Sequence, residues 1–207
     1  ADVASVYMAF AGALLIWGWI ELAFLTGVIT GPEKRDCPPG LTGRARFIRA
    51  WWTVAHHELA LLAGLVLVEM LSRDTTNKVA FWAYFILFIA RILAKLNVLF
   101  GIPRINTEFV PRPLAHLKSY FRRGPITVMF PVSVTILSFG TACFMQSLWS
   151  AETETMIVAT TLLTTLSALA LLEHWLMVVP LPDAKLWRWM LPAPADMTQD
   201  ERKTNGL

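Results

Sequence analysis

The amino-acid sequence predicts an all-α protein, a bundle of helices that crosses a membrane. Its 207 residues are 56% hydrophobic and only 16% charged, which is too little charge for the surface of a soluble domain of this length. Apolar stretches long enough to cross about 30 Å of hydrocarbon recur along the chain. Because a bilayer offers no partner for the backbone, and the alternation typical of transmembrane strands is absent, these stretches are expected to be helices.

Five spans are predicted, in one membrane domain that covers residues 1–207. In order they are Val3–Thr30, Phe47–Leu71, Val79–Phe100, Ile126–Trp149 and Thr155–Val179. The first span is too long for a cleavable signal peptide and lacks a basic segment before it. The chain begins with Ala1 rather than methionine, so we expect it to be processed or incomplete at that end.

The basic residues predict the orientation of the spans. Fourteen of them lie in the loop after the first span, the loop after the third span and the tail 180–207, whereas only Arg73 and Lys78 lie in the other two loops. The positive-inside rule makes the first group of segments cytoplasmic, including the C-terminus. This placement beside the membrane also argues against a nucleic-acid partner. Cys37 in a cytoplasmic loop and Cys143 in a span are not expected to form a disulfide.

Two cytoplasmic segments have the pattern of short amphipathic helices that lie in the plane of the membrane. Apolar residues recur at helical spacing among basic residues in 113–125, and an aspartate can cap a similar helix in 182–191. Ordinary anchoring to anionic headgroups and docking of a partner remain alternatives for both segments.

Ionisable residues occur at matching depths in four of the spans. Counted from the predicted cytoplasmic ends, they lie roughly 8–14 Å below the interface. The carboxylates are Glu21, Glu58 and Glu173, the cations are Arg91 and Lys95, and the histidines are His56, His57 and His174. Because isolated charges are costly in hydrocarbon, a buried polar network that pairs across helices is expected, with Glu173 one candidate partner of Arg91.

Three hypotheses remain for this layer. It is an ion-pair network that fixes helix packing, a ligand site in which a histidine binds a metal or the magnesium of a chlorin, or a carboxylate-bridged di-metal enzyme. The third is disfavoured, because neither Glu58 nor Glu173 is followed by a histidine at the i, i+3 spacing of that class. A proton-relay transporter is a further alternative, but no span is interrupted by a Pro/Gly pair and no repeat is visible.

Four stretches carry a family resemblance. They are WGWIELAFLTGVITGP (17–32), AHHELALLAGL (55–65), AKLNVLFGIPRINTEFVPRPLAHLKSYFRR (94–123) and LLEHWLMVVPLPDAKLWRW (171–189). Together they resemble the photosynthetic complex assembly protein PuhE family of purple bacteria. The resemblance implies a multi-pass protein of the bacterial inner membrane, including its intracytoplasmic photosynthetic part, encoded with reaction-centre and bacteriochlorophyll genes. It also implies that family members carry additional hydrophobic sequence before this start.

The function implied by this resemblance is assembly of, or pigment supply to, the photosynthetic reaction centre and core light-harvesting complex. The resemblance favours bacteriochlorophyll as the ligand of His56, His57 or His174, and it assigns no catalytic residue. An intramembrane metal- or haem-dependent enzyme that uses the His/Glu cluster is the alternative. Beside membrane lipids, the expected partners are reaction-centre and light-harvesting subunits. They would be contacted by Trp51, Trp52 and Trp82 within the membrane and by the segments around Tyr120 and Trp187.

Overall fold

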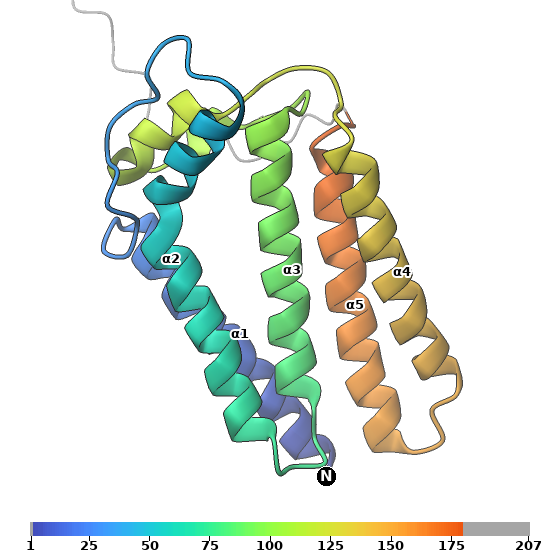
Figure 1. The fold of residues 1–207 in the computed structure, drawn as a ribbon. Coiled ribbons are helices and arrows are strands. Elements are labelled where there is room, and N and C mark those ends of the chain that lie inside the picture. Colours follow the sequence, from blue (N-terminus) through green and yellow to red (C-terminus); the bar gives the residue numbers. More distant parts are fainter. Residues whose placement is uncertain (1, 180–207) are drawn as a thin grey trace, which may run out of the picture.

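The structure, a computed structural model that describes residues 2–179, is a bundle of five long helices (Figure 1). They are α1 (Val3–Leu25), α2 (Gly43–Ser72), α3 (Val79–Phe100), α4 (Met129–Trp149) and α5 (Glu154–Leu176). All five are long and apolar enough to cross a membrane. Between residues 2 and 179 the only strand-like pairing is an isolated bridge of Ile102 with Arg123. The predicted all-α membrane bundle is therefore confirmed.

Helix α3 is the centre of the bundle, because it packs on each of the other four helices, whereas α4 packs mainly on α5. Tyr84 of α3 has no exposed surface, and its Oη donates a hydrogen bond of 3.1 Å to the carbonyl of Leu61 in α2. Gly64 faces the same ring, and a Cβ at this position would overlap the Tyr84 hydroxyl. A glycine thus lets α2 approach α3 closely at this level.

The first span ends five residues earlier than predicted, at Leu25 rather than Thr30. Gly27 adopts a φ of 80°, and the amides of Gly27 and Val28 donate to the carbonyls of Phe24 and Ala23. This pair of hydrogen bonds is a Schellman motif, which ends a helix where glycine can take a left-handed conformation. Helix α2 begins four residues before the predicted Phe47, and the boundaries of α3, α4 and α5 lie within three residues of the prediction.

The segment after α1 folds back against α2 and bends it. The amide of His57 donates to the Thr30 carbonyl at 2.9 Å, and the Trp52 carbonyl accepts from the amide of Glu33 at 3.2 Å. Gly31 lies so close that a Cβ would overlap the backbone of Trp52 and Thr53. A helix bends where an outside group enters its hydrogen-bond ladder, and Figure 1 shows α2 turning near this end.

The two long loops at this end form a cap over the bundle, and we call this side the capped end. Tyr120 Oη donates to the Arg35 carbonyl at 3.1 Å, and Ser119 Oγ accepts from the amide of Cys37 at 2.8 Å. Arg46 of α2 donates to the Tyr120 carbonyl. These bonds join the loop after α1, the loop after α3 and the first turns of α2 into one packed unit.

Most of the segment 113–125, predicted to be a short amphipathic helix, is helical. The segment is a 3₁₀ helix, η2 (Arg112–Tyr120), preceded by the single turn η1 (Thr107–Phe109). Leu114, Leu117 and Tyr120 are spaced by three, the repeat of a 3₁₀ helix, and all three are buried. The leucines pack on Phe24 of α1, and the docking of a partner on the segment around Tyr120 stays a prediction. The segment 182–191 and Trp187 lie outside the described residues.

Candidate functional site

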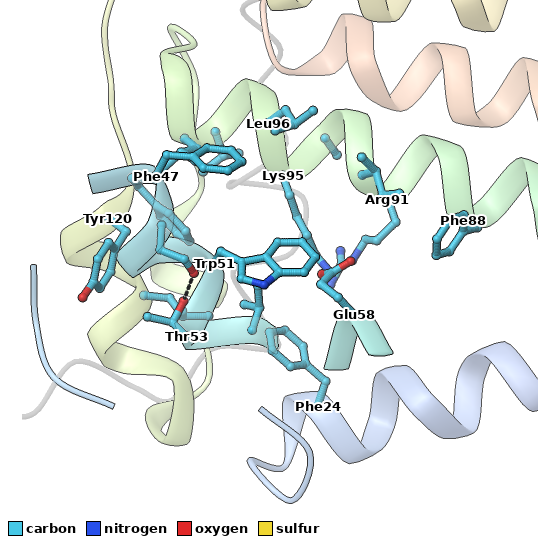
Figure 2. A pocket seen from close by; sticks show the side chains of 18 of the residues that line it. Phe24, Phe47, Trp51, Thr53, Glu58, Phe88, Arg91, Lys95, Leu96 and Tyr120 are labelled. Carbon is cyan, nitrogen blue, oxygen red and sulfur yellow. Dashed lines mark hydrogen bonds and ion pairs between the residues drawn. The ribbon is translucent and has the colours of Figure 1, made fainter. Parts of the chain in front are cut away.

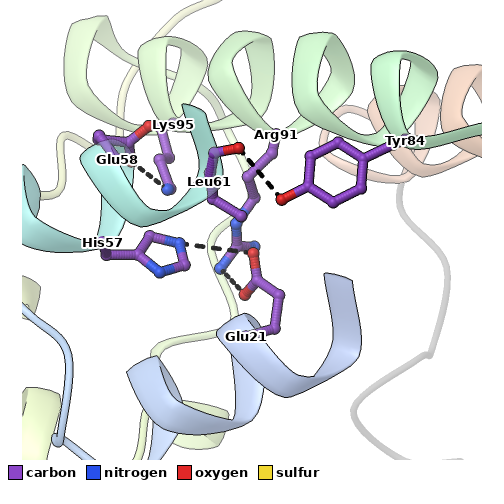
Figure 3. Close-up of polar contacts among 7 residues, drawn as sticks. All are labelled: Glu21, His57, Glu58, Leu61, Tyr84, Arg91 and Lys95. Carbon is purple, nitrogen blue, oxygen red and sulfur yellow. Dashed lines mark hydrogen bonds and ion pairs between the residues drawn. The ribbon is translucent and has the colours of Figure 1, made fainter. Parts of the chain in front are cut away.

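Two ion pairs join α1, α2 and α3 close to the capped end (Figure 3). Arg91 Nη2 of α3 donates to Glu21 Oε2 of α1 at 2.8 Å. The other oxygen of Glu21 lies 3.5 Å from His57 Nε2, at the outer limit of a hydrogen bond. Lys95 of α3 pairs with Glu58 of α2. Four of the five residues predicted to form a buried polar network, Glu21, Glu58, Arg91 and Lys95, are thus ion-paired across three helices. His57, predicted to bind a cofactor, lies beside Glu21.

The network lies nearer the helix ends than predicted. Because α1 ends at Leu25, Glu21 is four residues from its end, about 6 Å along the axis. Phe24 stacks on the His57 ring at a centroid distance of 4.2 Å, and the Lys95 ammonium lies 5.7 Å from the centre of the same Phe24 ring. The cap, rather than further turns of α1, covers the network.

The partner of Arg91 is Glu21, so the candidate pairing of Arg91 with Glu173 is wrong. Glu173 is exposed, and none of the residues 2–179 forms an ion pair with it. Its neighbour His174 has no exposed surface, and its Nδ1 lies 2.8 Å from the Ala170 carbonyl. Of these adjacent residues on α5, the histidine points into the bundle.

The adjacent histidines of α2 point in different directions. His57 has no exposed surface and lies against Glu21 and Phe24. His56 is exposed, one turn from the exposed Trp52. Neighbours on an α-helix are about 100° apart, so only one of the pair can face the network. His56 is the histidine of the three that a molecule in the bilayer could reach.

A cavity of about 590 Å³ lies beside the network, between α2, α3, η2 and the end of α5 (Figure 2). This volume is within the range of small-molecule sites, about 300–1,000 Å³. Most of the wall is aliphatic or aromatic, and the charged residues in it are Glu58, Arg91, Lys95 and Glu173. No histidine lines the cavity in the described part of the chain, although all three had been predicted to hold a ligand.

The cavity reaches the side of the bundle rather than only its end. Three residues in its wall belong to the outward surface of α2, where Trp51, Leu59 and Leu62 have 46%, 59% and 47% of their surface exposed. Exposed apolar side chains of a membrane-spanning helix face lipid. A molecule dissolved in the bilayer could therefore enter without passing through the cap.

Sequence reasoning missed the aromatic part of this wall. Phe88, Arg91 and Lys95 are spaced i, i+3 and i+7, so they share a face of α3, and all three line the cavity. Phe24 is three residues after Glu21 and belongs to the same wall. An aromatic residue three positions from Glu21 and another three positions from Arg91 were the signal that could have found it.

The arrangement gives a metal no obvious donor set. Among residues 2–179 no three His, Cys, Asp or Glu side chains gather closely enough to hold an ion. The three histidines lie in different surroundings: His57 lies beside Glu21, His56 is exposed on α2, and His174 is buried in the bundle. The His/Glu cluster expected for an intramembrane metal or haem enzyme is thus not assembled in the described chain.

Outside the spans, burial shifts two groups of the cap. It lowers the pKa of His116 below its usual value, an effect that nearby Asp36 partly opposes. Burial also raises the pKa of Tyr120, which a hydrogen bond with Arg49 partly offsets. His116 is therefore neutral and Tyr120 is a protonated donor near pH 7, which suits the hydrogen bond of Tyr120 to Arg35.

Comparison with known proteins places this chain in a family. No solved structure matches it. It is 47% identical over 196 residues to a protein of Rhodobacter capsulatus described as "Uncharacterized 30.4 kDa protein in puhA 5'region", a match that covers 95% of this chain and 72% of that protein. Residues 1–198 match the family described as "Protein of unknown function (DUF3623)". The chain is therefore a member of the DUF3623 family.

Proposed function

We propose that this protein is an assembly or pigment-supply factor for the photosynthetic reaction centre and core light-harvesting complex. Support comes from its similarity to a Rhodobacter capsulatus protein described by its position beside puhA, and from the resemblance of its sequence to the PuhE family. On this proposal it resides in the bacterial inner, intracytoplasmic photosynthetic membrane. The excess of basic residues in the loops at the capped end then makes that end and the C-terminus cytoplasmic.

The observation that carries the proposal is the lateral cavity. A pigment-supply factor must hold a membrane-soluble molecule and release it to a neighbour within the bilayer. A largely apolar cavity that opens at the side of the bundle, with a few polar groups on its inner wall, suits that task. Bacteriochlorophyll is one candidate, because aromatic residues such as Phe24, Trp51 and Phe88 can pack on the faces of a flat ring.

The histidines do not fit a bacteriochlorophyll held in this cavity. His57 and His174 have no exposed surface, and none of the three lines the cavity. A histidine ligand for the magnesium therefore stays a prediction for the exposed His56 alone, which would bind a pigment on the outer surface of α2. In the cavity itself the ring would be held by packing and by hydrogen bonds.

Partner subunits are expected to dock sideways. The loops at the end opposite the cap are short, covering residues 73–78 and 150–153, and they offer little surface. Trp51, Trp52 and Trp82 are exposed on the sides of α2 and α3. Large aromatic side chains are favoured at interfaces, so reaction-centre or light-harvesting subunits would contact the bundle there.

The test uses the protein in its own membrane. The full chain is purified gently and its absorption spectrum and metal content are measured, and photosystem yield is compared in cells with the wild-type chain, His56→Ala and His174→Ala. We expect a chlorin band, a lowered yield for His56→Ala, and lower accumulation of the His174→Ala protein because that ring is packed in the bundle. Normal reaction-centre and light-harvesting yield in cells without the protein would refute the assembly function. Iron without a chlorin would favour the enzyme alternative.

A further inference from the structure

The charged residues of the cavity wall leave hydrogen-bond donors without acceptors. Arg91 uses Nη2 for Glu21, and its Nε is buried without a partner among residues 2–179. Lys95 has three N–H donors and uses one for Glu58. Their side chains are 31% and 26% exposed although they lie within a membrane-spanning bundle, and both line the cavity. Unused donors beside an apolar space call for an acceptor from a ligand.

The charges around the cavity disfavour an anionic ligand. Arg91 and Lys95 are each matched by a carboxylate, Glu21 and Glu58. Glu173 adds a further carboxylate to the wall, and none of the residues 2–179 pairs with it. With neutral histidines, the two cations and the three carboxylates together carry a formal charge of −1. A phosphate or carboxylate head would therefore add to an excess of negative charge. A neutral acceptor meets the donors without that repulsion.

We propose that the cavity binds an uncharged amphiphile that has carbonyl oxygens at one end and an extended apolar body. The carbonyls accept hydrogen bonds from Arg91 and Lys95, and the apolar body lies along Phe88, Trp51 and Leu62 toward the opening in the side of the bundle. Figure 2 shows Trp51, Phe88, Arg91 and Lys95 among the side chains that line this space. This inference deepens the proposed function and rests on it only in taking the cavity as the ligand site. An isoprenoid quinone and an esterified chlorin share this chemistry.

The experiment measures binding to the full chain in lipid nanodiscs. Trp51 lines the cavity, so quenching of tryptophan fluorescence reports a bound quinone, chlorin or brominated lipid. The probes are a short-chain ubiquinone, bacteriochlorophyll a, brominated phosphatidylglycerol as the anionic amphiphile, and a brominated hydrocarbon without carbonyls. We expect saturable quenching by at least one of the two uncharged carbonyl-bearing probes, ubiquinone and bacteriochlorophyll a, at concentrations about tenfold below those needed for the anionic lipid and the hydrocarbon, as expected for one or two hydrogen bonds.

Matched variants locate the binding site. Ala50 lines the cavity and Ala63 is exposed elsewhere on the same helix, so Ala50→Phe should weaken binding about tenfold or more while Ala63→Phe leaves it unchanged. The double variant Glu58→Met with Lys95→Met removes both charges together with the N–H donors of Lys95, and it should weaken binding of the uncharged carbonyl probes several-fold without affecting the hydrocarbon. If Ala50→Phe fails to fold, this double variant alone decides whether the donors select the ligand.

The outcomes separate this inference from the proposed function. Binding of ubiquinone without bacteriochlorophyll supports the inference and refutes pigment supply, whereas binding of bacteriochlorophyll supports both. Equal or tighter binding of phosphatidylglycerol or of the hydrocarbon would overturn the inference. The inference would also be overturned if either Ala50→Phe or the double variant did not weaken the binding of ubiquinone or bacteriochlorophyll a. The assembly role is judged separately, by photosystem yield in cells.

Discussion

The pairing of Glu21 with Arg91 can be tested by a double-mutant cycle. The singles are Glu21→Gln and Arg91→Met, and each leaves the other charge in the bundle without its partner at 2.8 Å. Breaking a fully buried pair costs about 3–5 kcal/mol, whereas an exposed pair contributes about 0–1 kcal/mol. The side chains here are 16% and 31% exposed, so an intermediate cost of about 2 kcal/mol is expected for each single variant.

The cycle itself should be strongly non-additive. If the two residues are direct partners, the double variant is destabilised by about 1–2 kcal/mol less than the sum of the singles. The measurement is reversible unfolding of the full chain in mixed micelles, followed by circular dichroism. Because Glu21 also faces His57 at 3.5 Å, part of the cost of Glu21→Gln remains after Arg91 is removed.

Glu173 provides the matched control, since it lies in the same cavity wall as Arg91 without pairing with it in the described chain. Glu173→Gln combined with Arg91→Met should be additive within about 0.5 kcal/mol. Coupling of Arg91 to Glu173 but not to Glu21 would show that the helices are rotated differently about their axes. The description of the network and of the cavity charge would then both be refuted.

Three further predictions concern the cap and the orientation. Gly31→Ala should lower the free energy of unfolding by about 2 kcal/mol or more, because a Cβ would overlap the backbone of α2. Gly12→Ala, with open space around it inside α1, should not lower it. Burial lowers the pKa of His116 in the folded cap, so the unfolded cap binds a proton first as pH falls below about 6.5, and the cap becomes less stable. The protection factors of amides in 112–120, corrected for the intrinsic pH dependence of hydrogen exchange, should therefore be lower at pH 5.5 than at pH 7.5, and His116→Gln should abolish that difference. A reporter that works only in the cytoplasm should be active when fused after Leu207, and a reporter that works only outside should be active when inserted in 150–153. The reverse pattern would overturn the orientation.

Composition and run length were enough to predict the five helices, but local contacts decided where the helices end. The apolar run of the first span continues through Val28 and Ile29, so hydropathy alone extends it to Thr30. The left-handed Gly27 and its hydrogen bonds end the helix before that point. Hydropathy reports what a segment can bury, whereas capping depends on the conformation of single residues.

The sequence predicted that residues of the polar network share one level, but neither how far this level lies from the helix ends nor which residues pair. Alternating helix directions and a fixed rise per residue bring Glu21, His57 and Arg91 to one level. Which oxygen meets which nitrogen depends on the rotation of each helix about its axis, and that rotation is set by packing across the whole bundle. For this reason Glu173 was a reasonable candidate for Arg91 from the sequence, and the pair in the structure is a different one.

The cavity could not be predicted from the sequence, because residues outside the five long helices complete its wall. Leu117 and Tyr120 of η2 belong to its wall, and Tyr120 is tied to α2 through Arg46. The bend of α2 depends on the loop after α1, where Gly31 touches the helix backbone. A segment that sequence patterns predicted to be a membrane anchor therefore forms one wall of the candidate binding site. Loss of the cap should accordingly change the shape of the cavity, although the cap does not contain Arg91 and Lys95, which lie on α3.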